Sequence, residues 1–169
     1  MQRLLDEARI VFGRTGRARP AYKRFLSEAK ARGRTTTTLW QDVDTTTEAT
    51  KLLMDMFGDT LARETIERLK PKPHLLVSRC VALLTSGFGE CLDYFAGSGT
   101  TAHAVINLNR EDGGRRKFIL VEMADYFDTV LVPRVKKVMF TPEWKDGKPK
   151  RMATTEEAER TPRLVKLLR

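Results

Sequence analysis

The chain has 169 residues, with 31 Lys and Arg against 22 Asp and Glu, which gives a formal net charge of +9. This length suits a single domain with a modest hydrophobic core, and the charge favours a polyanionic partner such as nucleic acid. The sequence shows neither a signal peptide nor a transmembrane run, so we expect a cytoplasmic protein that binds no membrane. Cys80 and Cys91 lack C-x-x-C spacing and lie among apolar residues, which predicts buried thiols rather than a metal site or a disulfide.

The first third of the chain predicts a hairpin followed by a helix. A strand candidate, Ala8–Phe12, leads into the turn-forming sequence GRTGRARP. The arginines of this turn either lie in solvent or contact nucleic-acid phosphates. We expect a helix over 21–31 that is opened by Pro20 and ended by Gly33, with its apolar residues, Tyr22 among them, facing inward.

Further helices are predicted before the centre of the chain. A helix over 47–57 is ended by Gly58, and 59–70 is another amphipathic stretch. The sequence PKPHLLVSRCVALL follows, in which Pro73 fits the first turn of a helix. The apolar positions of this helix leave little room for a polar face, so we expect it to be largely buried.

The sequence CLDYFAGSGTTAHAV predicts a strand, a glycine turn and the start of a helix. Apolar residues within 92–95 form the strand, and Gly97, Ser98 and Gly99 then permit positive φ and a close approach of the backbone. A helix follows, capped by Ser98 or Thr100. The free N–H groups and partial positive charge of the helix start make this turn a place for a ligand.

A second strand, Lys117–Glu122, follows the predicted helix and ends in an acid. In a right-handed βαβ unit, the carboxylate of Glu122 lies beside the tip of the first strand, where it can accept hydrogen bonds from a ribose diol. Beyond it, 124–140 predicts a helix that is bent or restarted at Pro133. We expect 141–169 to be a polar, extended tail with a short last helix.

Several kinds of ligand compete for a glycine-rich turn. A P-loop needs a lysine after its last glycine, whereas Thr100 follows Gly99 here, and the third glycine of a dinucleotide-binding G-x-G-x-x-G motif is missing. Asp93, just ahead of the turn, would repel a pyrophosphate. The sequence therefore favours a ligand with a cationic end, such as the amino group of a methionine moiety.

Longer stretches of the sequence resemble a known family. The sequences LDYFAGSGTTAHAVINLNREDGG and RKFILVEMADYFDTVLVPRVKKV resemble the S-adenosylmethionine-binding part of the modification (Mod) subunits of type III restriction-modification systems. PKPHLLVSRCVALLTS and TLWQDVDTTTEATKLLMDMFG extend the resemblance, which covers 8–150. These subunits are adenine-N6 DNA methyltransferases of the group in which the catalytic motif precedes the cofactor motif.

The resemblance implies a fold, a division of the chain and a cofactor site. It implies an α/β, Rossmann-like methyltransferase fold with an incomplete sheet and a helical N-terminal segment, divided into a leading segment (1–70), a βαβ core that binds S-adenosylmethionine (71–140) and a polar tail (141–169). The resemblance implies that Lys72 and Pro73 line the methionine end of the cofactor site and that Asp93 binds the amino group, directly or through water. The backbone around Phe95, Gly97, Ser98 and Gly99 is expected to pack against the methionine and sugar. Thr100 and Thr101 lie at the helix start within reach of the carboxylate, and Glu122 is expected to hold the ribose hydroxyls.

No catalytic residue is predicted. Adenine-N6 methylation requires a flipped-out base that is gripped by stacking and hydrogen bonds, and the family uses Asp-Pro-Pro-Tyr or a close variant for this. The sequence lacks such a string, and His103 has no partner Ser, Cys or acid at a telling spacing. The missing motif is therefore expected upstream of Met1, and the isolated chain is expected to be an incomplete enzyme. Methyl transfer mainly requires positioning, so no metal is expected.

The partners implied by the resemblance are double-stranded DNA, the missing catalytic half and a restriction subunit. An open sheet edge also makes a homodimer an expectation. Two alternatives stay open, a non-catalytic DNA-binding partner that no longer binds cofactor and a small-molecule methyltransferase. Salt-sensitive DNA binding without cofactor binding would support the first, and methyl transfer without DNA would support the second.

Overall fold

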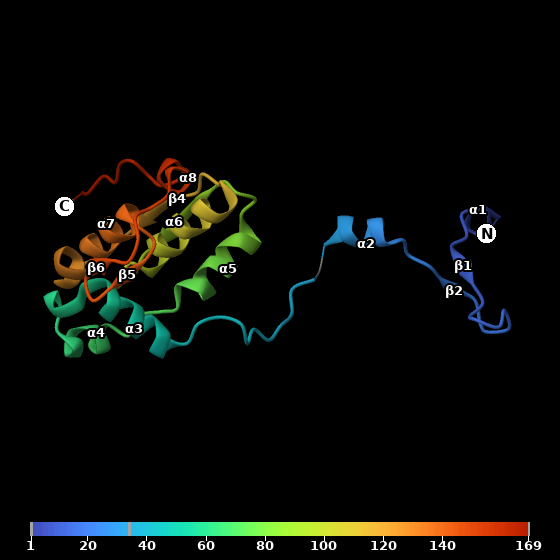
Figure 1. Cartoon of the computed structure of the whole chain (residues 1–169), viewed down its shortest axis with the longest axis horizontal. Helices are drawn as coiled ribbons and strands as arrows, with labels where there is room; N and C mark the ends of the chain where they lie inside the picture. The colour runs from blue at the N-terminus through green and yellow to red at the C-terminus, as the bar shows by residue number, and fades with distance from the viewer. Residues whose placement is uncertain (1, 34, 169) are drawn as a thin grey trace. The chain divides into compact units, whose positions relative to one another are not determined.

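The computed structural model describes residues 2–33 and 35–168 (Figure 1). The chain is mixed α/β with small sheets, and it divides into two compact units, Met1–Gln41 and Asp42–Arg169. None of the helices within the described ranges combines the length and the apolar character that a membrane crossing requires.

The first unit is built around a short hairpin. Its elements are α1 (Gln2–Asp6), β1 (Ile10–Val11), β2 (Ala21–Tyr22) and α2 (Leu26–Arg32). The antiparallel pairing of β1 with β2 confirms the predicted hairpin. The helix predicted over 21–31 was wrong in its first turn, because Ala21 and Tyr22 form the second strand of the hairpin.

Ionic contacts join the elements of this unit, and none of its described residues is buried. The guanidinium of Arg9 donates a 2.9 Å hydrogen bond to Glu28 Oε2 and lies 4.7 Å from the centre of the Phe25 ring. Neither α1 nor α2 contains a buried residue, and the Tyr22 and Leu26 side chains are 54% and 69% exposed. The predicted inward packing of these residues was therefore wrong.

The second unit begins with helices, and the first of them begins and ends close to where the sequence predicts. Its first elements are α3 (Thr46–Phe57), η1 (Gly58–Thr60), α4 (Arg63–Leu69) and α5 (His74–Leu84). At the start of α3, Thr45 Oγ1 accepts from the Glu48 N–H at 3.3 Å, and Glu48 Oε2 accepts from the Thr45 N–H at 2.6 Å. This capping box and Gly58 fix the two ends of α3 within one residue of the prediction.

A parallel βαβ unit forms the centre of the second unit. β3 (Glu90–Asp93) and β4 (Lys117–Leu120) pair in parallel, with Asp93 opposite Leu120, and α6 (Thr100–Asp112) connects them. This confirms the predicted strand, turn, helix and strand. One face of the sheet packs on α5 and α6 through Cys91 and Phe118. The other face leaves Leu92 and Ile119 about half exposed.

The remaining elements follow β4 in the chain. They are the π-helix η2 (Phe127–Leu131), α7 (Val132–Phe140), β5 (Trp144–Lys145), β6 (Lys148–Pro149) and α8 (Thr155–Glu159). α6 lies between α5 and α7 (Figure 1). The change from π-helix to α-helix beside Pro133 confirms the predicted break. Buried side chains of the main core are contributed by α3, α4, α6, η2 and α7, and include Leu53, Met56, Ile66, Ile106, Val130 and Val138.

Three predictions about the second unit were wrong. α5 is not largely buried, because it packs mainly against α6 and leaves Leu84 85% exposed. The two thiols are not buried as predicted, because Cys80 on α5 is exposed and Cys91 is half-buried. The tail is not simply extended, because β5 and β6 form a hairpin around Asp146 and Gly147, a dipeptide that favours tight hairpin turns.

Candidate functional site at the glycine turn

Asp93 fixes the end of β3 to the start of α6. Its Oδ1 accepts a 3.1 Å hydrogen bond from the Phe95 N–H, and its Oδ2 accepts a 2.5 Å bond from Thr101 Oγ1. The predicted helix cap was wrong, because Gly99 is the N-cap residue and no side chain caps α6. Thr101 instead restrains the carboxylate that was predicted to face the ligand.

The turn between β3 and α6 needs its glycines. Gly97 has φ 54° and Gly99 has φ 81°, a region in which a side chain is strained. The turn is tied to the end of β4 by a 3.1 Å bond from the Ala96 N–H to the Val121 carbonyl. Its backbone is therefore held in one conformation beside the tip of the second strand.

Glu122 lies where the sequence predicts, beside the glycine turn. Its Oε2 accepts a 2.7 Å bond from the Gly97 N–H, and its Oε1 accepts bonds of 3.0 Å from the N–H groups of Met123 and Ala124. Asp93 and Glu122 thus lie at the same, carboxyl end of the parallel sheet, which is where ligands bind in open α/β sheets.

Lys72 and Pro73, here called the Lys-Pro segment, contact the end of the glycine turn through the backbone of Lys72. Thr100 Oγ1 donates a 3.4 Å bond to the Lys72 carbonyl, and Pro73 is buried. The Lys72 side chain is exposed, and its Nζ donates to the Lys70 carbonyl at 3.3 Å. The structure therefore brings Lys72 and Pro73 to the glycine turn but directs the lysine ammonium toward Lys70.

Solvent-exposed apolar side chains flank the glycine turn. Phe95 is 90% exposed, Met123 is 96% exposed and Tyr94 is 64% exposed. Phe95 was expected to contribute its backbone, and its ring adds an uncovered aromatic surface beside Asp93. Exposed apolar surface next to a polar turn is typical of a binding site.

Sequence reasoning missed a buried basic cluster beneath the turn. Arg134 on α7 is fully buried, and its guanidinium donates to Ser98 and Thr100 and contacts His103 Nδ1 at 3.2 Å. The ring of His103 stacks on that of His74 with 4.6 Å between centroids. A usable signal was present, because Arg134 lies on the same helical stripe as the buried Leu131 and Val138.

The pKa values in this cluster are all lowered. Burial lowers the pKa of Arg134 to about 9, and burial together with the Arg134 charge holds the pKa of His103 well below its ordinary value. Burial also lowers the pKa of His74, although Asp44 works against it. His103 is therefore neutral near pH 7 and can accept a hydrogen bond at Nδ1.

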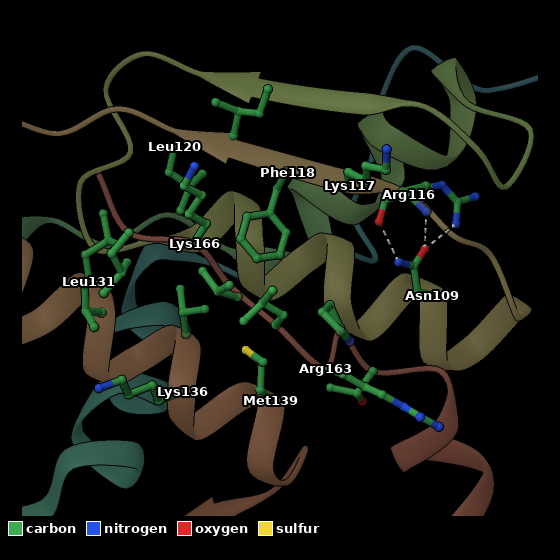
Figure 2. Close-up of a pocket in the computed structure, with 18 of the residues that line it drawn as sticks. Asn109, Arg116, Lys117, Phe118, Leu120, Leu131, Lys136, Met139, Arg163 and Lys166 are labelled. Carbon is green, nitrogen blue, oxygen red and sulfur yellow. Dashed lines mark hydrogen bonds between the residues drawn. The ribbon is translucent and has the colours of Figure 1, made fainter. Parts of the chain in front are cut away.

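A cavity of about 1230 Å³ runs along β4 (Figure 2). It is lined by β4, α7 and 159–168, with an apolar wall of Phe118, Leu120, Leu131 and Met139. At one end, Asn109 Nδ2 donates a 2.9 Å bond to the Arg116 carbonyl, and at the other end the cavity reaches Glu122. This cavity could not be predicted from the sequence, because it depends on where the C-terminal residues pack.

Comparisons with known proteins identify the family of the chain. A family model described as DNA methylase, for N6 and N4 methyltransferases, matches residues 13–131. The type III restriction-modification enzyme StyLTI Mod subunit of Salmonella typhimurium is 39% identical over 119 residues, which are 70% of this chain and 17% of that protein.

Two further relatives are similar over comparable stretches. The EcoP15I Mod subunit of Escherichia coli is 32% identical over 73% of this chain and 18% of its own length. The type II methyltransferase M.KpnI of Klebsiella pneumoniae is 40% identical over 50% of this chain and 19% of its own length. The chain thus spans less than a fifth of each of these relatives. As the sequence predicted, the chain belongs to the DNA methylase family and is similar to type III Mod subunits.

Proposed function

We propose that the glycine turn binds S-adenosylmethionine and that the chain is the cofactor-binding portion of an adenine-N6 DNA methyltransferase of a restriction-modification system. The observation that carries this proposal is the 2.7 Å bond between the Gly97 N–H and Glu122 Oε2. It brings a carboxylate from the second strand against a positive-φ turn after the first strand. A carboxylate in this position is suited to a ribose diol.

The side chains around the turn fit the cofactor chemically. Asp93 is half-buried with its carboxylate oriented by Phe95 and Thr101, so it can face a cationic amino group. Ser98, Gly99 and Thr100 are buried and offer a close backbone surface for the methionine and sugar. When bound, the cofactor supplies the methyl group, and these residues orient it for in-line transfer.

The proposed architecture is a Rossmann-like methyltransferase fold with an incomplete sheet. Parallel sheets are ordinarily covered on both faces, whereas here Leu92 and Ile119 remain exposed on one face. We propose that a catalytic half covers this face and pairs along β3, and that a homodimer forms through the same edge when this half is absent. Within the chain, 1–70 leads into the core, 71–140 binds the cofactor and 141–169 is the tail.

The proposed substrate is double-stranded DNA, and a restriction subunit is the proposed partner. The net charge of +9 supports binding to a polyanion. The sequence contains no Asp-Pro-Pro-Tyr string, so we propose that the chain does not methylate DNA alone.

Calorimetric titration of S-adenosylmethionine into the purified chain tests the proposed cofactor site. The parent chain should bind saturably, and Asp93→Asn and Glu122→Gln should each weaken binding by about tenfold or more, as expected for a lost charge-assisted contact. Glu90→Gln is the matched control, because Glu90 is an exposed carboxylate at the other end of β3 that pairs with Lys117. A folded parent chain without saturable binding would overturn the proposal.

A methyl-transfer assay separates the proposal from its alternatives. Labelled cofactor should leave DNA unmodified with the chain alone, and label should enter DNA when a catalytic half containing Asp-Pro-Pro-Tyr is added. Transfer to a small molecule without DNA would favour a small-molecule methyltransferase. Salt-sensitive DNA binding by a chain that binds no cofactor would favour a non-catalytic partner.

A further inference from the structure

Arg134 is a buried cation that forms no ion pair with an acid in the part of the chain that the structure describes. It is 0% exposed, burial alone shifts its pKa, and its Nε has no hydrogen-bond partner among the described residues. A buried charge without a counter-ion is costly, and an apolar side chain of similar volume would fill the site at less cost to stability. The arrangement is therefore better explained by what the guanidinium holds than by a contribution to the core.

One terminal nitrogen of Arg134 holds the glycine turn. Its Nη1 donates to Ser98 Oγ at 2.8 Å, to the Ser98 carbonyl at 3.2 Å and to Thr100 Oγ1 at 3.1 Å. Thr100 Oγ1 in turn donates to the Lys72 carbonyl at 3.4 Å. The hydroxyl of Thr100 thus links the guanidinium on α7, the glycine turn and the Lys-Pro segment.

The other terminal nitrogen reaches the Lys-Pro segment by a second route. Arg134 Nη2 lies 3.2 Å from His103 Nδ1, and because a guanidinium can only donate, Nδ1 must accept. The His103 ring stacks on His74, the residue that follows Pro73. One route from Arg134 therefore ends on the Lys72 carbonyl, and the other ends on the ring of His74, directly after the Lys-Pro segment.

We propose that Arg134 is a positioning residue that keeps the Lys72–Pro73 segment aligned with the glycine turn, so that two walls of the cofactor site are preorganised. The inference rests on the proposed function, because it names what holds that same site in place. Arg134 itself is fully buried, so it acts through the groups that it holds. Its donors point in several directions from a rigid plane, which a lysine ammonium on a flexible stem cannot reproduce.

The first test compares Arg134→Lys with Arg110→Lys in the full chain. Arg110 is a matched control, because it is a buried arginine on α6 that donates to Thr161 and to the carbonyl of Val138, away from the turn. Arg134→Lys should raise the dissociation constant for S-adenosylmethionine by about tenfold or more, and Arg110→Lys should leave it within about twofold. Equal affinities of Arg134→Lys and the parent chain would overturn the inference.

Thr100→Val tests the proposed link through the Thr100 hydroxyl, and it can be used in place of Arg134→Lys if that variant does not fold. It removes the shared hydroxyl but leaves the guanidinium, so it should weaken binding by a similar factor. In the double variant the two losses should fall clearly short of additive, because both act on the same linkage. Additive losses would mean that Arg134 and Thr100 act independently, which contradicts the linkage.

Amide hydrogen exchange tests the inference without any ligand. The Gly99 N–H donates to the Ala96 carbonyl and the Val77 N–H to the Pro73 carbonyl, so these amides report on the turn and on the Lys-Pro segment. Both should exchange about tenfold faster or more in Arg134→Lys, and neither should change in Arg110→Lys. Unchanged exchange would overturn the inference, whereas absence of cofactor binding by the parent chain would overturn the proposed function alone.

Discussion

The Gly97 N–H and Glu122 Oε2 are 2.7 Å apart, although α6 and β4 lie between the two residues in the chain. The same carboxylate accepts from Met123 and Ala124, so backbone donors hold both of its oxygens. The acid therefore orders the glycine turn and the chain that leaves β4. A ligand that binds Glu122 acts on a preorganised group.

Gly97→Ala should weaken cofactor binding and lower the free energy of unfolding only modestly. Gly97 has φ 54°, and a Cβ there would meet no atom closer than the Phe95 carbonyl oxygen at 3.9 Å. Gly97→Ala should therefore cost only backbone strain, about 1–2 kcal/mol of unfolding free energy, while shifting the N–H that Glu122 holds. Urea unfolding and calorimetric titration would measure the two effects.

Gly16→Ala is the control for Gly97→Ala. Gly16 also has positive φ with open space around it, but it lies in the hairpin of the first unit. It should leave the affinity for S-adenosylmethionine unchanged. A Gly97→Ala chain that binds as tightly as the parent would show that the turn conformation does not matter for the ligand.

Gly58→Ala should destabilise the second unit strongly. Gly58 has φ 54°, and a Cβ there would lie 2.8 Å from the carbonyl carbon and oxygen of Asp146 and 2.9 Å from the Gly147 nitrogen. Backbone strain and overpacking against another backbone should together cost about 2–4 kcal/mol. Gly33→Ala, at positive φ with nothing near, should leave the thermal transition of the second unit unchanged, and equal melting temperatures for Gly58→Ala and the parent would contradict the close approach.

Local sequence signals predicted the elements whose ends are marked by a glycine or an acid. Gly58 marked the end of α3, and the glycine turn with its following acid defined the βαβ unit. These features are set by a few neighbouring residues, so they can be read without knowing the tertiary structure. The approach of Glu122 to Gly97 followed from the handedness of the βαβ connection.

Features that depend on distant partners were missed. Tyr22 was assigned to a helix because its pairing with Ile10 lies across the hairpin, and α5 was predicted to be buried because its apolar residues do not show which neighbours are present. Arg134 joins the site only through α7, far from the turn in sequence. The roles of the site residues toward the cofactor stay predictions.

The two cysteines should differ in their reaction with maleimides. Cys80 is exposed on α5, whereas Cys91 is half-buried in β3 and burial raises the pKa of its thiol. Because the thiolate is the reactive form, Cys91 should react at least about tenfold more slowly than Cys80 near neutral pH. Mass spectrometry of the partly labelled chain would show the order, with Cys80→Ser as the control, and faster labelling of Cys91 would contradict its burial.

Acid should destabilise the second unit through His103 and His74. The pKa values of His103 and His74 are lowered in the folded chain, so below their ordinary value of about 6.5 the unfolded chain binds more protons than the folded one. The free energy of unfolding must then fall as pH falls, by up to about 1.4 kcal/mol per pH unit for each histidine. In His103→Asn the amide oxygen can accept from Arg134 in place of Nδ1 but does not titrate. Urea unfolding at about pH 7.5 and about pH 5 should therefore show a smaller acid loss in His103→Asn than in the parent, and an equal loss in both would mean that His103 is protonated within the fold.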